Sequence, residues 1–189
     1  MTDALHPQLA ELVGELRAAT DRARALAIRL DENAFARRPA PQRWSPAECL
    51  AHLNLTTRAF LLLIDEALER GRASGRRMTG RYRRDLVGSL LARSLEPPAR
   101  FRMATTAPFV PSGVRSRDEV VGEFVVLQEE LVRRVEQASG LDLNRLRVAS
   151  AFNPRLKYNL FSCFAVLAAH ERRHLWQAED AADAADGTE

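Results

Sequence analysis

Residues 156–177, LKYNLFSCFAVLAAHERRHLWQ, carry the pattern that decides the fold. Apolar and histidine side chains alternate here at steps of four and three residues. The positions are Leu156, Leu160, Cys163, Leu167, His170, His174 and Gln177. This spacing places them on one face of a helix, so we predict a long helix here, the last of the chain.

Two earlier stretches predict two more helices. Leucines and alanines of residues 5–30 follow the same four-three rhythm, which indicates an apolar stripe along a helix of about 25 residues. A proline-rich break follows, and Ser45-Pro-Ala-Glu48 then forms a capping box with proline in the first turn. We expect the second helix to run from there to about Arg70, before Gly71 and Gly75.

A second capping box, Ser116-Arg-Asp-Glu119, opens the predicted third helix, which Gly140 closes. Between the second and third helices, residues 71–115 are rich in glycine and proline, with a short helix allowed at residues 81–95. The sequence therefore predicts an all-α fold, a four-helix bundle with a long crossover connection between helices two and three. We expect one domain over residues 1–180 and a disordered tail at residues 181–189.

Composition and charge exclude several classes of protein. With 46% hydrophobic and 28% charged residues, the chain is not disordered. Its apolar runs, such as residues 59–64, are too short for a membrane span, and the N-terminus lacks a secretory signal. Two cysteines also argue against a disulfide scaffold, so we expect a cytoplasmic protein with no membrane partner.

Basic residues gather in one segment of the chain. From Arg70 to Arg102 there are ten arginines against Asp85 and Glu96, a local net charge of +8. A nucleic-acid surface is one interpretation. The segment has few aromatic residues and the rest of the chain is net acidic, so we favour a solvent-facing connection and expect no nucleic-acid partner.

Three of the four histidines lie on predicted inward faces. His170 and His174 are one turn apart, about 6 Å along the helix, a spacing that can chelate one metal ion. His52 belongs to the inward stripe of the second helix, with Cys49, Thr56, Ala59 and Leu63. Three neutral imidazoles in a bundle core would suit Zn²⁺, Ni²⁺ or Fe²⁺. The alternative is that each is a core residue bonded to a backbone carbonyl.

His170-Glu171-Arg-Arg-His174 also matches the HExxH motif of zinc proteases, in which the glutamate is the general base. Those proteases take a third ligand further along the chain, whereas Gln177 and Asp180 stand at the Gly and His positions of the extended motif. We therefore reject a protease, and a surface pairing with Arg172 or Arg173 is an equal alternative for Glu171.

The segments Trp44-Ser-Pro-Ala-Glu-Cys-Leu-Ala-His52 and Asn153-Pro-Arg-Leu … His170-Glu-Arg-Arg-His174-Leu-Trp-Gln177 resemble the two signature regions of DinB-like proteins. This family of putative metalloenzymes has a four-helix bundle that holds one divalent metal. The resemblance implies His52, His170 and His174 as ligands. Two features depart from it: many relatives have His-Pro where this chain has Asn153-Pro154, and the 71–115 connection is longer and more basic.

The same resemblance implies a function. The family includes thiol-dependent enzymes, so we expect a metal-dependent S-transferase or hydrolase that uses a low-molecular-weight thiol and a small-molecule substrate. Thr56 and Gln177, each one turn from a predicted ligand, are the candidate cofactor-binding residues. The alternative is a non-catalytic, stress-related metal-binding bundle protein, and a homodimer is open as the assembly.

Overall fold

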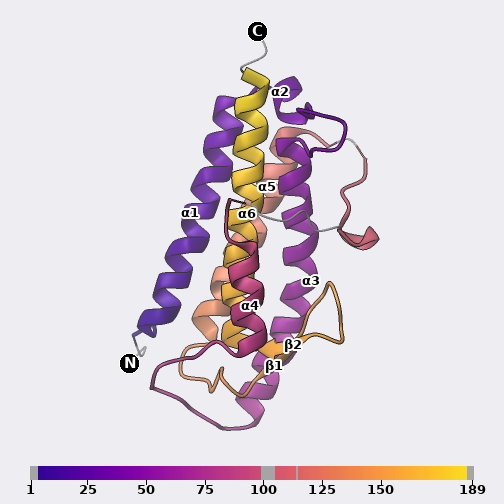
Figure 1. Ribbon diagram of the computed structural model, residues 1–189. Coiled ribbons are helices and arrows are strands. Elements are labelled where there is room, and N and C mark those ends of the chain that lie inside the picture. The colour runs from indigo at the N-terminus through magenta and orange to yellow at the C-terminus, as the bar shows by residue number, and fades with distance from the viewer. Residues whose placement is uncertain (1–3, 99–104, 114, 187–189) are drawn as a thin grey trace.

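The computed structural model describes residues 4–98, 105–113 and 115–186, and within them the chain is mostly helical, in agreement with the all-α prediction. Four long helices run side by side (Figure 1). They are α1 (Pro7–Arg29), α3 (Pro46–Ala73), α5 (Arg117–Gln137) and α6 (Leu160–Asp186). Helices α5 and α6 each contact both α1 and α3. Helices α1 and α6 run toward the C-terminal end of the molecule, and α3 and α5 run the other way.

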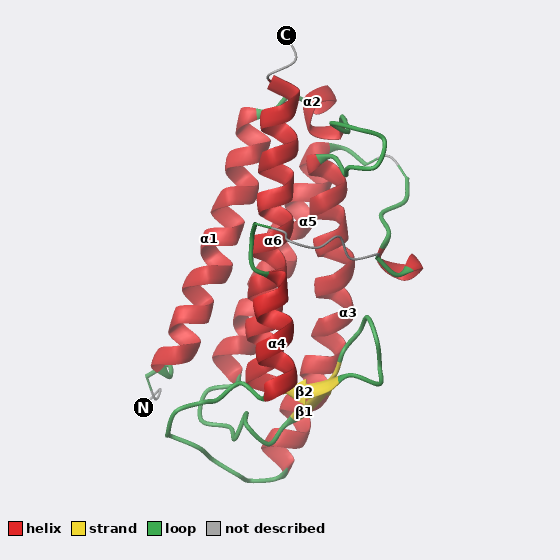
Figure 2. Ribbon diagram, in the orientation of Figure 1, coloured by secondary structure: helices red, strands yellow, loops and turns green. Residues whose placement is uncertain are grey.

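Shorter elements connect the long helices (Figure 2). They are α2 (Glu32–Ala36), α4 (Leu86–Leu95), the 3₁₀ turn η1 (Ala107–Phe109), β1 (Arg147–Ala149) and β2 (Lys157–Asn159). Strands β1 and β2 pair antiparallel, with Val148 opposite Tyr158. The sequence did not predict this hairpin, because three-residue strands are too short to show a period of two.

Both predicted capping boxes are confirmed. The Ser45 hydroxyl accepts a hydrogen bond from the Glu48 amide, and the Glu48 carboxylate accepts one from the Ser45 amide. Ser116 and Glu119 make the same reciprocal pair at the start of α5. These bonds satisfy amides that the helix itself leaves free, which is why α3 and α5 begin where the sequence predicts.

The basic connection is more ordered than a solvent-facing loop. Helix α4 packs along α6, and Tyr82 before it is buried. At Gly88 the two helices approach so closely that an added Cβ would overlap the Ser162 side chain. The expectation of a short helix in residues 81–95 is correct, but the expectation of a solvent-facing connection is wrong for α4, because its apolar face covers α6.

Helix α6 differs from the prediction at both ends. It begins at Leu160, because Leu156 belongs to the turn before β2. It continues to Asp186, whereas the sequence predicts a disordered tail from residue 181. Ala181 and Ala182 are buried, and Asp183 pairs with Arg29 of α1 at 2.6 Å. The small alanine side chains are therefore enough to pack this end of α6, although the sequence has no bulky apolar residue here. Residues 187–189 lie outside the described part.

Helix α3 is the one described helix long and apolar enough to cross a membrane, judged by length and composition. More than half of its most apolar window is buried inside the protein, where it contacts α5 and α6. Its apolar character therefore fits a core helix.

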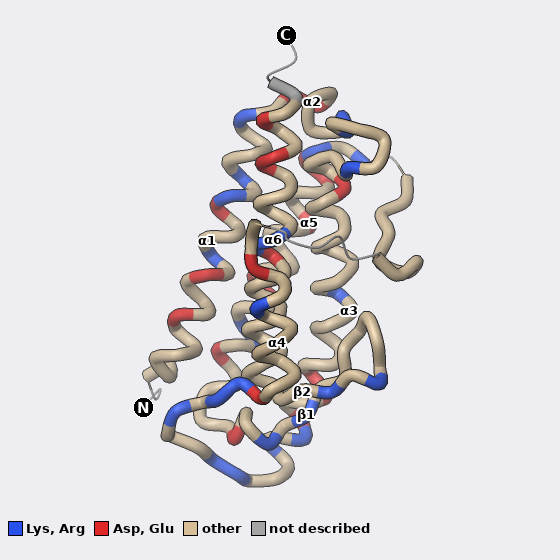
Figure 3. Tube along the Cα trace, viewed as in Figure 1, with Lys and Arg blue, Asp and Glu red and all other residues tan. Residues whose placement is uncertain are grey.

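One end of the molecule is basic. Figure 3 shows lysine and arginine gathered where the loop before α4 meets the β1–β2 hairpin. Exposed members include Arg76, Arg77, Arg83, Arg84 and Arg155. The sequence cluster accounts for the first four, and the fold adds Arg155.

Candidate metal centre

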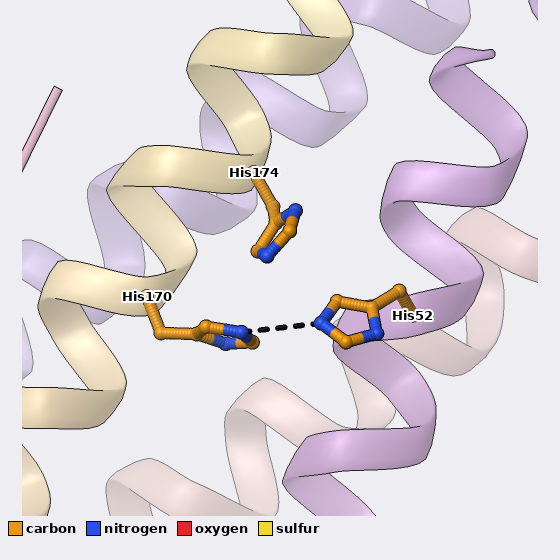
Figure 4. A group of neighbouring side chains, drawn as sticks. All are labelled: His52, His170 and His174. Carbon is orange, nitrogen blue, oxygen red and sulfur yellow. Dashed lines mark hydrogen bonds between the residues drawn. The ribbon is translucent and has the colours of Figure 1, made fainter. Parts of the chain in front are cut away.

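His52 of α3 and His170 and His174 of α6 point toward one another (Figure 4). One ring nitrogen of each lies within 4.8 Å of the other two. The Nε2 atoms of His52 and His170 are 3.1 Å apart. The three side chains are only 2, 5 and 8% exposed, respectively. The structure thus brings together all three predicted ligands, which are separated by up to 122 residues in the sequence.

The surroundings keep these imidazoles neutral. Burial lowers the pKa of His52, although the hydrogen bond to Phe109 raises it in part. Burial, and then the neighbouring imidazoles and Arg173, lower the pKa of His170 and His174 well below the usual value. Neutral imidazole is the form that carries a lone pair for a metal ion.

A backbone contact fixes the orientation of His52. Its Nδ1 lies 2.7 Å from the carbonyl oxygen of Phe109 in η1. A carbonyl can only accept, so we assign the proton to Nδ1, which donates to it. Nε2, which faces His170, then carries the lone pair. A ligating histidine is commonly oriented through its other nitrogen in this way.

The donor set fits a divalent cation of the zinc, nickel or iron type. It consists of three buried nitrogen atoms, which such ions favour. Nδ1 of His174 is buried and has no hydrogen-bond partner within the described residues. A buried polar atom without a partner is costly, so the cluster as it stands is incompletely satisfied. Three buried histidines in this arrangement can hold a metal ion.

A cavity of about 670 Å³ adjoins the cluster, and all three histidines line it. Its wall includes the aromatic rings of Trp44, Phe152 and Trp176. The Trp44 ring centre is 5.0 Å from that of His52, and the Phe152 ring centre is 5.5 Å from that of His170. The histidines therefore face a largely apolar chamber large enough for a small molecule.

The two predicted cofactor contacts lie in different surroundings. Gln177 lines the cavity, one turn beyond His174. Thr56 is fully buried, and its hydroxyl donates to the carbonyl oxygens of His52 and Leu53 at 3.0 and 2.9 Å. Thr56 is not part of the described cavity wall, so the structure does not bring it to a bound molecule there.

The surface interpretation of Glu171 is wrong. Its side chain is 2% exposed, and Oε1 accepts a 2.8 Å hydrogen bond from Nε2 of Gln128 on α5. Glu171 belongs to a second buried stripe of α6, one residue on from the histidine stripe. That stripe is Phe164, Ala168, Glu171, Leu175, Ala178 and Ala182. Helix α6 is thus buried on two adjacent faces, and Glu171 is not part of the cavity wall.

Three residues at the site were not predicted from the sequence. Phe109 and Phe152 lie in connecting segments, where no periodicity marks a side chain as inward. Arg173 lies within the quoted HExxH string, 4% exposed, and lines the cavity. Its charge suggested a surface residue. Asn153 is exposed, and its side chain accepts a hydrogen bond from the Arg155 amide.

Fold and site together define an all-α protein with three buried histidines beside an apolar cavity. The model of the DinB superfamily matches residues 15–178, so the chain belongs to that superfamily. This confirms the resemblance seen in the two sequence segments. No curated protein and no solved structure matches the chain.

Proposed function

We propose that the protein is a metal-dependent enzyme, a thiol S-transferase or hydrolase, with His52, His170 and His174 as the ligands of one divalent ion. The observation that carries this proposal is the convergence of three buried imidazoles on the wall of a cavity of about 670 Å³. We also assign the packing of α1, α3, α5 and α6 to a four-helix bundle in which the α3–α5 connection is the crossover.

The cavity favours an enzyme over the non-catalytic alternative. A structural metal site is closed by four protein ligands, whereas a catalytic site keeps a position for water or substrate. In the described part of the chain, the group that can hold an ion consists of the three histidines alone. Their position on the cavity wall supports access by a small molecule.

The chain's own residues have distinct roles in this proposal. The Phe109 carbonyl holds the His52 ring, and Trp44, Phe152 and Trp176 give the site an aromatic wall. A divalent ion at the three nitrogens supplies a Lewis acid that lowers the pKa of a thiol or of water. Cys49 lines the cavity, but burial raises the pKa of its thiol, so it stays protonated and is a poor nucleophile. The reacting thiol therefore comes from a cofactor, with Gln177 as its candidate contact.

The remaining assignments are also proposals. We propose a small-molecule substrate, no nucleic-acid or membrane partner, a cytoplasmic location and a homodimer. The burial of α3 in the protein core supports the absence of a membrane partner.

A thiol-transfer assay tests the activity. Zinc-loaded protein is mixed with the chromogenic electrophile 1-chloro-2,4-dinitrobenzene and, in turn, cysteine, glutathione and coenzyme A. We expect a rate above the uncatalysed background with one thiol class, loss of that rate in His52→Ala, and retention in Cys49→Ala. One bound metal per chain with no activity toward this electrophile with any of the three thiols would instead favour the non-catalytic bundle.

A further inference from the structure

A second cavity, of about 530 Å³, is lined by helix α1, by the loop that leads into α4, and by α6. It shares no wall residue with the cavity beside the histidines. Its apolar wall includes Leu12 of α1 and Phe161 of α6. The loop contributes Arg81, Arg83 and Arg84, and Figure 3 shows the basic stretch that leads into α4. The cavity therefore combines apolar surface with a row of arginines.

Hydrogen bonds to the backbone hold the loop that carries these arginines. The side chain of Gln8 bonds the backbone of Tyr82 twice, donating to its carbonyl oxygen at 3.1 Å and accepting from its amide at 2.8 Å. The Arg83 amide donates to Asn144 at 2.8 Å, and the Arg83 carbonyl oxygen accepts from Asn159 at 2.9 Å. The loop is therefore positioned by the protein itself, which lowers the cost of ordering it when a ligand binds.

The guanidinium groups of these three arginines form no ion pair with the described residues. Glu15 of the same wall pairs with Arg172, and Asp85, which follows the arginines in the sequence, pairs with Arg147 at 2.7 Å. Glu11 also lines the cavity, and counting its one negative charge against the three arginines leaves a net charge of +2. Like charges in one cavity repel, so an anionic ligand would be attracted there.

The charge of this wall suits a phosphate group better than a carboxylate. A phosphate monoester carries about 1.5–2 negative charges at pH 7, which matches the net charge of the wall, and it offers three acceptor oxygens. Those oxygens can bond more than one guanidinium, and arginine binds phosphate through two parallel hydrogen bonds. A single carboxylate brings one charge and two oxygens. Leu12 and Phe161 offer apolar surface to the organic part of such a ligand.

We propose that this cavity binds a small phosphorylated molecule, with its phosphate held by Arg81, Arg83 and Arg84 and its organic part against Leu12 and Phe161. The inference goes beyond the proposed function and does not depend on it, because the two cavities have separate walls. It gives a role to three of the ten arginines of the basic segment.

Calorimetric titration with phenyl phosphate tests the proposal. The protein is chelator-treated at pH 7.5, so that the probe meets no metal ion at the histidines. We expect saturable binding of one phenyl phosphate per chain. Phenylmalonate, which has the same ring and two carboxylates, should bind about fivefold more weakly or worse.

Two double variants that remove the same charge locate the site. Arg81→Gln/Arg83→Gln should weaken phenyl phosphate about tenfold or more, because both residues line the cavity. Arg76→Gln/Arg77→Gln is the matched control, at exposed positions of the same loop outside the wall, and should weaken it less than about threefold. All four positions are exposed, so both variants should fold, which circular dichroism checks.

Three results would overturn the proposal. The first is no saturable binding of phenyl phosphate by the wild type. The second is an equal loss of affinity in the two double variants, which would show that the probe responds only to overall charge. The third is an equal affinity for phenylmalonate, which would make the phosphate assignment wrong. Should the cavity variant fail to fold, Arg84→Gln replaces it, with Arg76→Gln as its control and the same difference expected. Metal content is measured separately, so failure of the metal site and failure of this site are distinguishable.

Discussion

Glu171 directly follows the predicted ligand His170 in the sequence. Its carboxyl nevertheless accepts a 2.8 Å hydrogen bond from Gln128 of α5 and is not part of the cavity wall. One residue corresponds to a turn of about 100° around the helix, which separates the two side chains. The HExxH string therefore lacks the geometry of a protease site, because its glutamate is not part of the cavity wall that the three histidines line.

Glu171→Gln should leave the metal centre intact. The amide has the shape of the carboxyl and can still bond Gln128, so we expect unchanged metal content and most of any thiol-transfer rate. In a zinc protease the same change would cost several orders of magnitude in rate. Elemental analysis and the assay check this together. Peptidase activity that disappears in Glu171→Gln would show that the enzyme class is wrong.

Glu171 also makes the free energy of unfolding depend on pH. Burial raises its pKa from the usual 4.5 to about 8, so the folded state keeps it protonated. Above pH 4.5 the Glu171 carboxyl is ionised in the unfolded state but still protonated in the folded state. The free energy of unfolding therefore falls with rising pH, until the folded state also ionises near pH 8. The free energy of unfolding of metal-free wild type should fall from pH 5 to 8 relative to that of Glu171→Gln, by at most about 1.4 kcal/mol for each pH unit.

Urea unfolding of both proteins across that range, with chelator present, measures the difference. The histidines are the same in both proteins, so their contribution cancels. Parallel pH curves would mean that the fold does not hold Glu171 protonated.

Gly88→Ala should destabilise the protein, although alanine is the better helix former. The new Cβ would overlap Ser162 and push α4 away from α6, which we expect to cost about 1–3 kcal/mol. Gly122→Ala in α5 is the matched control, because nothing lies within 4 Å of its added Cβ. That change should stabilise by up to about 1 kcal/mol. Thermal unfolding of the two variants and the wild type measures these effects. If Gly88→Ala stabilises the protein, the close packing of α4 against α6 is refuted.

The arginines of the basic end should not affect the metal. Arg70 lies 18 residues beyond His52 on α3, about 27 Å along the helix. Replacing Arg76, Arg77, Arg83 and Arg84 by Gln should therefore leave metal content unchanged. A gel-shift titration at two salt concentrations tests nucleic acid. A strong, salt-sensitive DNA affinity that the four substitutions abolish would make nucleic acid a partner.

The long helices and the three histidines could be predicted because both depend on periodicity. Capping boxes at Ser45 and Ser116 marked the helix starts, and the four-residue step from His170 to His174 placed two imidazoles on one face. His52 needed the family resemblance as well, since nothing local says which two helices are neighbours.

The walls of the site could not be predicted in the same way. Phe109 and Phe152 reach the histidines from irregular segments, where side-chain direction depends on tertiary packing. Glu171 and Arg173 were misread for a different reason. Charged residues usually lie at the surface, but Glu171 is buried against Gln128 of α5. Arg173 is buried on the face of α6 that α4 covers, where it contacts Ser94.

The metal content of the purified protein tests the central claim most directly. We predict close to one divalent ion per chain in the wild type, less than a tenth of that in His52→Ala and His170→Ala, and full content in His6→Asn. His6 is a matched control because it caps α1 with its ring nitrogen, a role that asparagine can keep. The wild type should also melt at a lower temperature after chelation, whereas His170→Ala should not change. Wild-type protein that is metal-free, with a melting temperature unmoved by added Zn²⁺ or Ni²⁺, would contradict the account.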